Sequence, residues 1–389
     1  MQKHKINECV RRLGAMDWNR RLFDALIPLP DGTSYNAYLV RGSGKTALID
    51  TADPTKSEIL MEQLADVERV DYLVANHAEQ DHSGSIPRVL ERHPEAVLLA
   101  TPKGKGMLID LLCVPAARIR TVADGETISL GDRTLEFIHT PWVHWPETMC
   151  TYLQEEAILF SCDFFGSHYA TTDLFVSDKA AVYEAAKRYY AEIMMPFRTA
   201  IRKNLDKVQS RLVKMIVPSH GPVYDDAAFI IEAYEDWVAE AVKNEVVVPY
   251  ISMHGSTEKM VLHLTGALAE RGVKVHLFDL SVTDIGKLAI ALVDAATIVI
   301  GTPTVHFGPH PAVFYASHLA NALRPKVRYA SIIGPYGWSS KAIEQIAGLI
   351  PNLKVEILDP VLCRGFPQGE TFAALGKLAT MIADRHDKL

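Results

Sequence analysis

Residues 77–82 read His-Ala-Glu-Gln-Asp-His and follow the apolar run DYLVAN at residues 71–76. The run predicts a short buried strand, so the hexapeptide begins just past the carboxyl end of that strand. Four of the six residues are common metal ligands: His77, Glu79, Asp81 and His82. The stretch therefore predicts a metal site at a sheet edge, and Glu79 is the residue that bears most on the choice of metal.

Three further candidate ligands follow other predicted strands. His144 lies in TPWVHWP, Asp163 closes AILFSCD, and His220 closes MIVPSH. Carboxyl ends of strands in an α/β layer converge on one edge, so we expect these side chains to meet those of the hexapeptide. Any one of them could equally be a surface or structural residue, but the complete set favours a metal centre.

Composition limits the classes of function. The chain has 389 residues, which suggests two domains, and its formal net charge of −7 argues against nucleic acid as a partner. The N-terminal residues are charged throughout, unlike a secretory signal, and the apolar stretch around residues 290–300 is broken by Asp294. We expect no membrane partner and a cytoplasmic location. The five cysteines are scattered, which predicts free thiols rather than a disulfide framework.

The pattern of elements changes near residue 244. Up to that point, short apolar runs alternate with turn signals and some helices, a layered α/β pattern. From residue 245 onward, about five strands alternate with helices, which predicts a doubly wound parallel sheet of flavodoxin-like order. Pro249 lies in the first of these strands and predicts a bulge or an edge position there. The predicted domains are residues 1–244 and residues 245–389.

The spacing of the candidate ligands resembles the metallo-β-lactamase fold, in which most members carry H-x-H-x-D-H and use zinc. Here Glu79 occupies the place of the second histidine. A carboxylate-rich set with imidazoles suits iron or manganese, so Glu79 favours redox chemistry over hydrolysis. Across essentially its whole length, the chain is similar to the flavodiiron proteins, or A-type flavoproteins. That resemblance implies an N-terminal αββα metallo-β-lactamase-like sandwich followed by a flavodoxin-like domain.

The same resemblance implies how the ligands are divided between two iron ions. His77, Glu79 and His144 would bind one iron, Asp81 and His220 the other, and Asp163 would bridge them; these six would form the catalytic set. For His82, two roles stay open: direct metal binding, or support of a ligand. Asp50, at the end of TALID, resembles a carboxylate that supports the fold.

Three loops of the second domain are candidates for binding FMN. The first, SMHGSTEKM, is rich in hydroxyl groups and runs into a helix whose N-terminus could hold a phosphate, although a simple helix cap would look the same. The others, GTPTVHFG and GPYGWSS, also leave the carboxyl ends of strands. The predicted contacts are Ser252, His254, Gly255, Ser256, Thr257, Pro303, Thr304, Val305, Gly334, Tyr336, Gly337, Trp338 and Ser339.

The resemblance implies an oxidoreductase. Electrons would pass from an external donor, rubredoxin or a reduced deazaflavin, through FMN to the diiron site. That site would reduce dioxygen to water, nitric oxide to nitrous oxide, or both. A head-to-tail homodimer is implied, with a tetramer as a further assembly. Near the irons, Trp145, Tyr190 and Phe197 are candidates for shaping a gas pocket, and core packing is the competing role.

Two other functions remain open at this point. One is a dinuclear zinc hydrolase carrying a flavodoxin-like appendage, which Glu79 opposes. The other is an electron carrier whose first domain is only structural, which the complete ligand set opposes. The ligand set itself does not distinguish dioxygen from nitric oxide.

Overall fold

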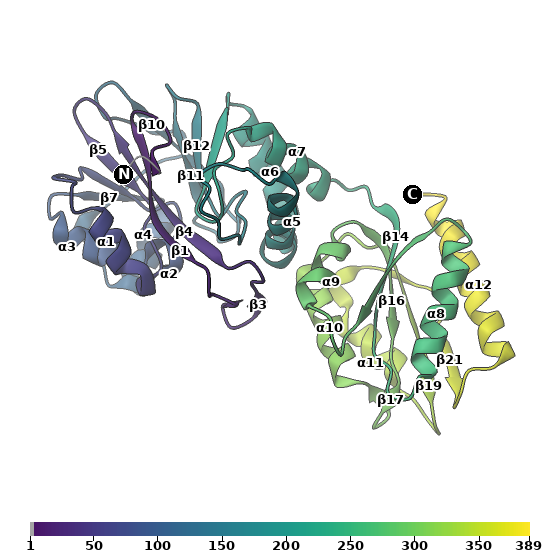
Figure 1. Cartoon of the computed structure of the whole chain (residues 1–389). Helices are drawn as coiled ribbons and strands as arrows, with labels where there is room; N and C mark the ends of the chain where they lie inside the picture. Colours follow the sequence, from purple (N-terminus) through teal and green to yellow (C-terminus); the bar gives the residue numbers. More distant parts are fainter. Residues whose placement is uncertain (1–3) are drawn as a thin grey trace. The chain divides into compact units, whose positions relative to one another are not determined.

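The computed structural model describes residues 4–389, which divide into two compact units. The first contains the chain up to Tyr190 together with Phe197–Val238, and the second contains Ala191–Pro196 and Ala239–Leu389. Each unit has its own sheets and helices (Figure 1). Residues 244 and 245, between which the sequence predicts the boundary, lie in β14 (Lys243–Tyr250), the first strand of the second unit's large sheet.

The first unit contains two large sheets. One has the order β1-β4-β5-β6-β7-β8, with β1 and β4 antiparallel and the strands from β5 to β8 parallel. Its strands are β1 (Val10–Asp17), β4 (Thr33–Arg41), β5 (Thr46–Ile49), β6 (Tyr72–Val74), β7 (Val97–Ala100) and β8 (Ile119–Thr121). The other has the order β13-β12-β11-β10-β9. Its strands are β9 (Thr127–Ser129), β10 (Thr134–His139), β11 (Met149–Leu153), β12 (Ile158–Cys162) and β13 (Met215–Pro218).

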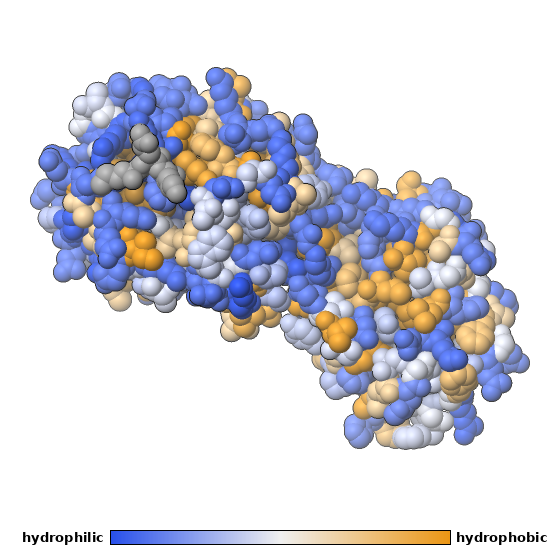
Figure 2. All heavy atoms as spheres, in the orientation of Figure 1, coloured by the Kyte–Doolittle hydropathy of each residue, from blue (hydrophilic) through white to orange (hydrophobic). Residues whose placement is uncertain are grey.

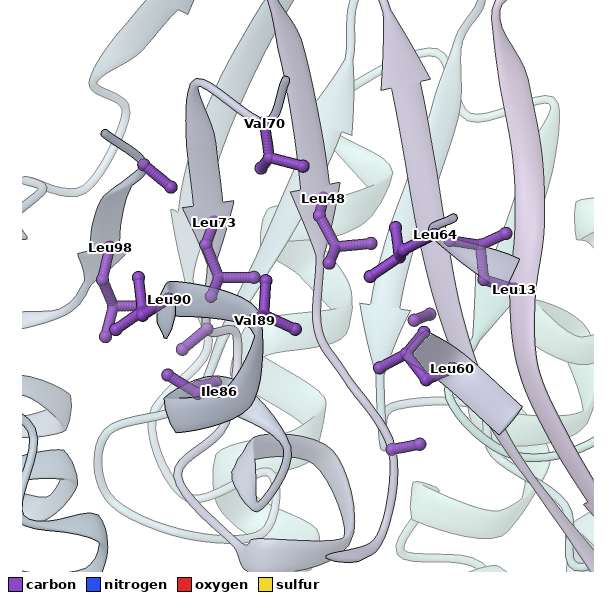
Figure 3. Packing of buried hydrophobic residues seen from close by; sticks show 14 of the residues in the cluster. Leu13, Leu48, Leu60, Leu64, Val70, Leu73, Ile86, Val89, Leu90 and Leu98 are labelled. Carbon is purple, nitrogen blue, oxygen red and sulfur yellow. The ribbon is translucent and has the colours of Figure 1, made fainter. Parts of the chain in front are cut away.

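Apolar side chains fill the space between these two sheets. Tyr38 and Ile49 of the first sheet share one buried cluster with Phe137, Phe160 and Val217 of the second. A second cluster lies on the other face of the first sheet (Figure 3). There the helices α1 (Ser57–Gln63), α3 (Ile86–Arg92) and α4 (Pro102–Leu112) cover Leu48, Leu73 and Leu98.

Helices also cover the outer side of the second sheet. These are α5 (Lys179–Tyr189), α6 (Arg198–Gln209) and α7 (Ala227–Val238) (Figure 1). Two polar contacts attach α6 and the turn after it to the sheet: Asn204 donates to the Pro141 carbonyl at 3.0 Å, and Arg211 is paired with Glu136. The predicted αββα sandwich is confirmed.

The second unit is built on a parallel sheet with the order β15-β14-β16-β19-β20, and β21 also pairs with β19. Its strands after β14 are β15 (Lys274–Asp279), β16 (Ala295–Gly301), β19 (Tyr329–Tyr336), β20 (Glu356–Ile357) and β21 (Val361–Arg364). One face packs against α8 (Ser256–Ala269) and α12 (Gly369–His386). The other packs against α9 (Ile285–Leu292), α10 (Pro311–Leu323) and α11 (Ala342–Leu349). The predicted flavodoxin-like order is confirmed.

The expectation for Pro249 is wrong. Its strand β14 is central, between β15 and β16, and its register against both neighbours is continuous around Pro249. The only register shift between β14 and β16 lies between Lys243 and Val246. A central strand tolerates this proline because only one main-chain donor is lost, while the flanking pairs keep the strand in place.

A close approach between β19 and the segment after β16 gives a test of the fold. A Cβ atom at Gly334 would lie 1.8 Å from the main-chain oxygen of Thr302. We expect G334A to destabilise this unit by about 1–3 kcal/mol, since main chain cannot move aside as a flexible side chain can. G376A in α12 is the matched control: a Cβ there meets nothing within 4 Å, and alanine in a helix should stabilise by about 0.5–1 kcal/mol. Urea midpoints followed by circular dichroism would measure both shifts, and equal midpoints for the two variants would contradict the expectation.

The surface is mostly hydrophilic on the face drawn in Figure 2, with apolar side chains exposed in places on both units. Trp338 is the most exposed tryptophan, at 77%, and Trp142 is exposed at 48%. Within residues 4–389, no helix combines the length and the hydropathy that crossing a bilayer requires.

Candidate metal centre and flavin cleft

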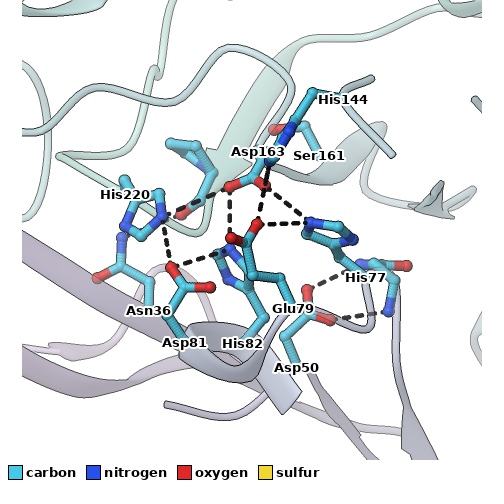
Figure 4. Close-up of polar contacts among 12 residues, drawn as sticks. Asn36, Asp50, His77, Glu79, Asp81, His82, His144, Ser161, Asp163 and His220 are labelled. Carbon is cyan, nitrogen blue, oxygen red and sulfur yellow. Dashed lines mark hydrogen bonds and ion pairs between the residues drawn. The ribbon is translucent and has the colours of Figure 1, made fainter. Parts of the chain in front are cut away.

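The seven candidate ligands all lie at strand ends on one edge of the first unit's two sheets. His77 and Glu79 follow β6, and Asp81 and His82 lie in the single turn α2 (Gln80–Ser83). His144 lies in the loop between β10 and β11. Asp163 directly follows β12, and His220 follows β13. The structure brings all seven side chains together (Figure 4).

One group consists of His77, Glu79, His144 and Asp163. The Oε2 atom of Glu79 lies 3.1 Å from Nε2 of His77 and 3.1 Å from Nε2 of His144. Oδ2 of Asp163 lies 3.4 Å from each of the same two nitrogens. The side chains of Glu79 and His144 are 14% and 15% exposed, whereas those of His77 and Asp163 are buried. The centre therefore opens to solvent beside Glu79 and His144.

A second group consists of Asp81, His82 and His220. Oδ2 of Asp81 lies 3.1 Å from Nε2 of His220 and 3.3 Å from Nε2 of His82. The other oxygen of Asp163, Oδ1, faces this group, 3.0 Å from His82 Nε2 and 3.4 Å from His220 Nε2. The two oxygens of Asp163 thus point to different groups, as a bridging carboxylate requires.

The chemistry of these atoms fits a pair of metal ions. Both carboxylate oxygens of Asp81 and of Asp163, and both ring nitrogens of His82, are buried without a hydrogen-bond partner. Buried polar atoms of this kind are costly unless a cation or a donor satisfies them. Within each group, the potential ligand atoms lie within 4.8 Å of one another. The mixture of imidazole and carboxylate suits iron or manganese.

The pKa values of the cluster also indicate a site for cations. Burial by itself would lower the pKa of His77, but hydrogen bonds with Glu147 and Glu79 raise it to about 10. Carboxylates overcome burial in the same way at His144, whose pKa rises to about 10, and at His82, whose pKa rises to about 9. Burial would raise the pKa of Asp163, yet His82 and His144 hold it well below its usual range. The carboxylates therefore require positive charge, from protons or from metal ions.

Metal loading should consequently release protons. Because the pKa values of His77, His82 and His144 lie above 7, all three are protonated at pH 7 without metal. Ferrous iron must displace those protons, so its affinity should increase as the pH rises toward 9 to 10. Anaerobic calorimetry in buffers of different ionisation enthalpy should detect this release of protons as iron binds. Release of none would contradict this picture of the cluster.

Two further carboxylates form hydrogen bonds with the segment that carries His77. Glu147 accepts hydrogen bonds from Nδ1 of His77 at 2.7 Å and from the main-chain nitrogen of Ala78 at 3.0 Å. Asp50 accepts from the main-chain and side-chain nitrogens of Asn76 at 2.8 and 3.0 Å. Glu147 was not predicted, although it lies only three residues after His144.

The expected pocket residues fall in different places. The ring of Trp145 lies 4.9 Å from that of His77, whereas Phe197 stacks on Trp142 at 6.0 Å. Tyr190 faces away from the ligands, with its hydroxyl donating to the Trp237 carbonyl at 3.3 Å. Its neighbour Tyr189 lies at the centre instead: burial, and next the carboxylate of Asp163, raise the pKa of Tyr189 well above its usual value.

His168 also lies beside the centre and was not predicted. Its ring is 4.7 Å from that of His220, and its Nδ1 lies 2.8 Å from the hydroxyl of Thr33. Burial, and then the neighbouring His220, lower the pKa of His168 well below its usual value, so it is neutral.

The second unit has a cleft of about 450 Å³ at the carboxyl ends of its strands. Seven of the predicted flavin contacts line it: His254, Ser256, Thr257, Pro303, Thr304, Tyr336 and Gly337. Met253, Pro335, Gly365 and Phe366 line it as well and were not predicted. The N-terminus of α8 faces this cleft through Ser256 and Thr257, which suits a phosphate group.

The remaining predicted flavin contacts, Ser252, Gly255, Val305, Gly334, Trp338 and Ser339, are not among the residues that line the cleft. The hydroxyl of Ser252 accepts from the main-chain nitrogens of Gly255 and Glu258, so it shapes the loop. Gly334 packs against Thr302, and the ring of Trp338 lies 6.3 Å from that of Phe307.

Comparisons with known proteins show which family the chain belongs to. Residues 33–221 match the family model described as ODP family beta lactamase. The chain is 36% identical to a nitric oxide reductase of Moorella thermoacetica, with 98% of each chain covered. The structure superposes on rubredoxin oxygen:oxidoreductase of Desulfovibrio gigas with a TM-score of 0.94, at 29% identity over 99% of this chain and 98% of that one. It superposes on the flavodiiron protein of Giardia intestinalis with a TM-score of 0.91, at 28% identity over 98% of each. The chain belongs to the flavodiiron proteins, the A-type flavoproteins.

Proposed function

We propose that this chain is an oxidoreductase that passes electrons from an external donor through FMN to two iron ions, where dioxygen is reduced to water or nitric oxide to nitrous oxide. The observation that carries the proposal is the placement of Asp163 between two groups of ligands, one oxygen toward each. We assign the two domains of the chain to residues 1–244 and residues 245–389.

The ligand roles follow from the two groups. His77, Glu79 and His144 would hold one iron, and Asp81 with His220 the other, with Asp163 shared. We assign His82 to the second group, because its Nε2 approaches both Asp81 and Asp163 and its nitrogens have no other hydrogen-bond partner.

When bound, the iron pair supplies electrons to the gas, and FMN supplies a two-electron store that can be emptied one electron at a time. The chain's own residues supply access, orientation and control of protons. A small gas molecule would reach the centre on the side where Glu79 and His144 are partly exposed. Tyr189 keeps its phenol proton at physiological pH, so it can donate a hydrogen bond next to Asp163.

The cleft at the N-terminus of α8 is the proposed FMN site. The main-chain nitrogens and hydroxyls of Ser256 and Thr257 would hold the phosphate, while Thr304 and Tyr336 line the part of the cleft suited to the ring. Thr304 donates to Ser340 at 2.8 Å, which ties two of the loops together.

The donor, the assembly and the location are also proposals. Rubredoxin and a reduced deazaflavin are the candidate donors, and separate assays with each would choose between them. The exposed aromatic residues Trp338 and Trp142 would suit an interface in a head-to-tail homodimer, or in a tetramer built from it. All five cysteines are free thiols, as suits the reducing cytoplasm.

Metal and flavin analysis of the purified protein tests the proposal, followed by anaerobic stopped-flow mixing of the reduced protein with each gas. We expect about two irons and one FMN per chain, and rapid oxidation by dioxygen, nitric oxide or both. Two zinc ions with hydrolysis of thioesters or lactams would establish the hydrolase alternative. Flavin without metal would establish the electron carrier, and a reduced protein inert to both gases would also defeat the proposal.

A further inference from the structure

Of the four imidazoles that face Asp163, His77 on one side and His220 on the other have different groups behind them. His77 turns Nε2 toward the ligand group, so its Nδ1 carries the proton and donates it to Oε1 of Glu147 at 2.7 Å. Both side chains are buried, with exposures of 0% and 1%. The ring is therefore backed by a full negative charge in a site shielded from water.

His220 is backed by a neutral group. Its Nδ1 donates to the main-chain oxygen of Ser34 at 2.6 Å, and its Nε2 faces Asp81 and Asp163. Each ligand group has one carboxylate of its own, Glu79 or Asp81, and each shares Asp163. Between His77 and His220, only His77 is thus hydrogen-bonded from behind by a carboxylate, that of Glu147.

Glu147 is held firmly in this position. The loop that carries it also carries His144, and Thr101 donates to the Glu147 carbonyl at 2.8 Å. Oε1 is fixed twice, by His77 and by the main-chain nitrogen of Ala78. Oε2 is buried without a hydrogen-bond partner, so no donor disperses its charge. Glu147 is therefore a positioning residue that also polarises His77.

A carboxylate behind a ligating imidazole makes the ring a stronger electron donor and favours the more highly charged metal ion. Resting on the proposed diiron function, we propose that Glu147 makes the two irons inequivalent. An iron held by His220 and Asp81 would be the easier of the two to reduce, and an iron held by His77 would be the harder. Each reduction would take one electron from the reduced flavin and lower the charge of one ion by one unit.

The test is E147Q in the intact FMN-containing protein. Glutamine keeps an oxygen that can accept from His77 and Ala78, so orientation is retained while the charge is lost. Mössbauer spectra of ⁵⁷Fe-loaded protein would be recorded during stepwise anaerobic reduction, because they detect iron without interference from flavin. We expect wild type to accumulate a form with one ferric and one ferrous ion. In E147Q the second reduction should become easier, so the maximum population of that form should fall.

A second measurement is the titration of ferrous iron into metal-free E147Q against a chelator. Iron should bind about 10–100-fold more weakly than in wild type at one position only.

Asp124 supplies the control. It is a carboxylate outside the cluster, with its side chain 47% exposed, and it pairs with Lys207 at 2.8 Å. D124N should leave the order of reduction unchanged, and E147D should restore part of the wild-type behaviour. If E147Q retains two irons and leaves the half-reduced population unchanged, or weakens both positions equally, the inference is wrong while the proposed function stands. If wild type binds no iron, the proposed function itself has failed.

Discussion

Replacing Glu79 with histidine is expected to lower gas reduction by roughly 1,000-fold or more, about 4 kcal/mol in activation free energy, while FMN remains bound. Oε2 of Glu79 lies 3.1 Å from both His77 and His144, so the variant exchanges a charged oxygen for a neutral nitrogen at the middle of one ligand group. Loss of that negative charge disfavours ferric iron and moves the set toward the kind that binds zinc.

Metal analysis after growth with both metals should show zinc rising at the expense of iron in E79H. E79D is the matched control, because it keeps the carboxylate on a shorter side chain and should retain iron with reduced activity. Flavin absorbance should be the same in both variants, since the cleft lies in the other unit. An E79H protein with two irons and undiminished gas reduction would show that the glutamate does not select the metal.

The second large effect is expected for D163N, which should reduce the iron content to one ion per chain or fewer and abolish turnover. Among the seven candidate ligands, Asp163 is the one whose two oxygens approach both groups, at 3.0–3.4 Å from the four imidazoles. Asparagine provides one oxygen and no charge, so less negative charge would remain among the four histidines to balance positive charge there. D163E keeps the charge and should retain more iron than D163N.

Iron content and electron paramagnetic resonance of the half-reduced protein would check this prediction, because magnetic coupling requires two adjacent ions. D124N is a suitable control outside the cluster, since Asp124 pairs with Lys207 at the surface. A D163N protein with two coupled irons would show that another group bridges them.

The meeting of the seven candidate ligands at one sheet edge could be predicted, because each lies after a strand and strand ends of one layer converge. Tyr190 was expected near the irons, but the tyrosine beside Asp163 is its neighbour Tyr189. Adjacent residues on a helix point about 100° apart, and α5 ends at Tyr189, where the chain widens into a π-helical turn, Tyr190–Met194. Hydrophobic pattern does not fix helix rotation at such a point.

Glu147 and the cleft residue Phe366 could not be predicted for a different reason. Each is placed by residues that are distant in sequence. Glu147 accepts a hydrogen bond from His77, and Phe366 lines the cleft together with residues from 253–257 and 335–337. Their roles depend on how loops fold back over the sheet edge, and loop conformation has no periodic signal in the sequence. Strand ends do carry such a signal. The candidate ligands at strand ends could therefore be predicted, whereas the loop residues Glu147 and Phe366 could not.

The contact between Gly334 and Thr302 restricts how this flavin-binding unit can change over time. With main chain against main chain, strand β19 and the segment after β16 have no side chain between them to absorb a substitution. A mutation that shifts one segment must be accommodated by the other. Substitutions in these two segments are therefore coupled. In the loop before α8 the constraint is of another kind: a Cβ at Gly255 would meet nothing within 4 Å, but its φ of +81° favours glycine.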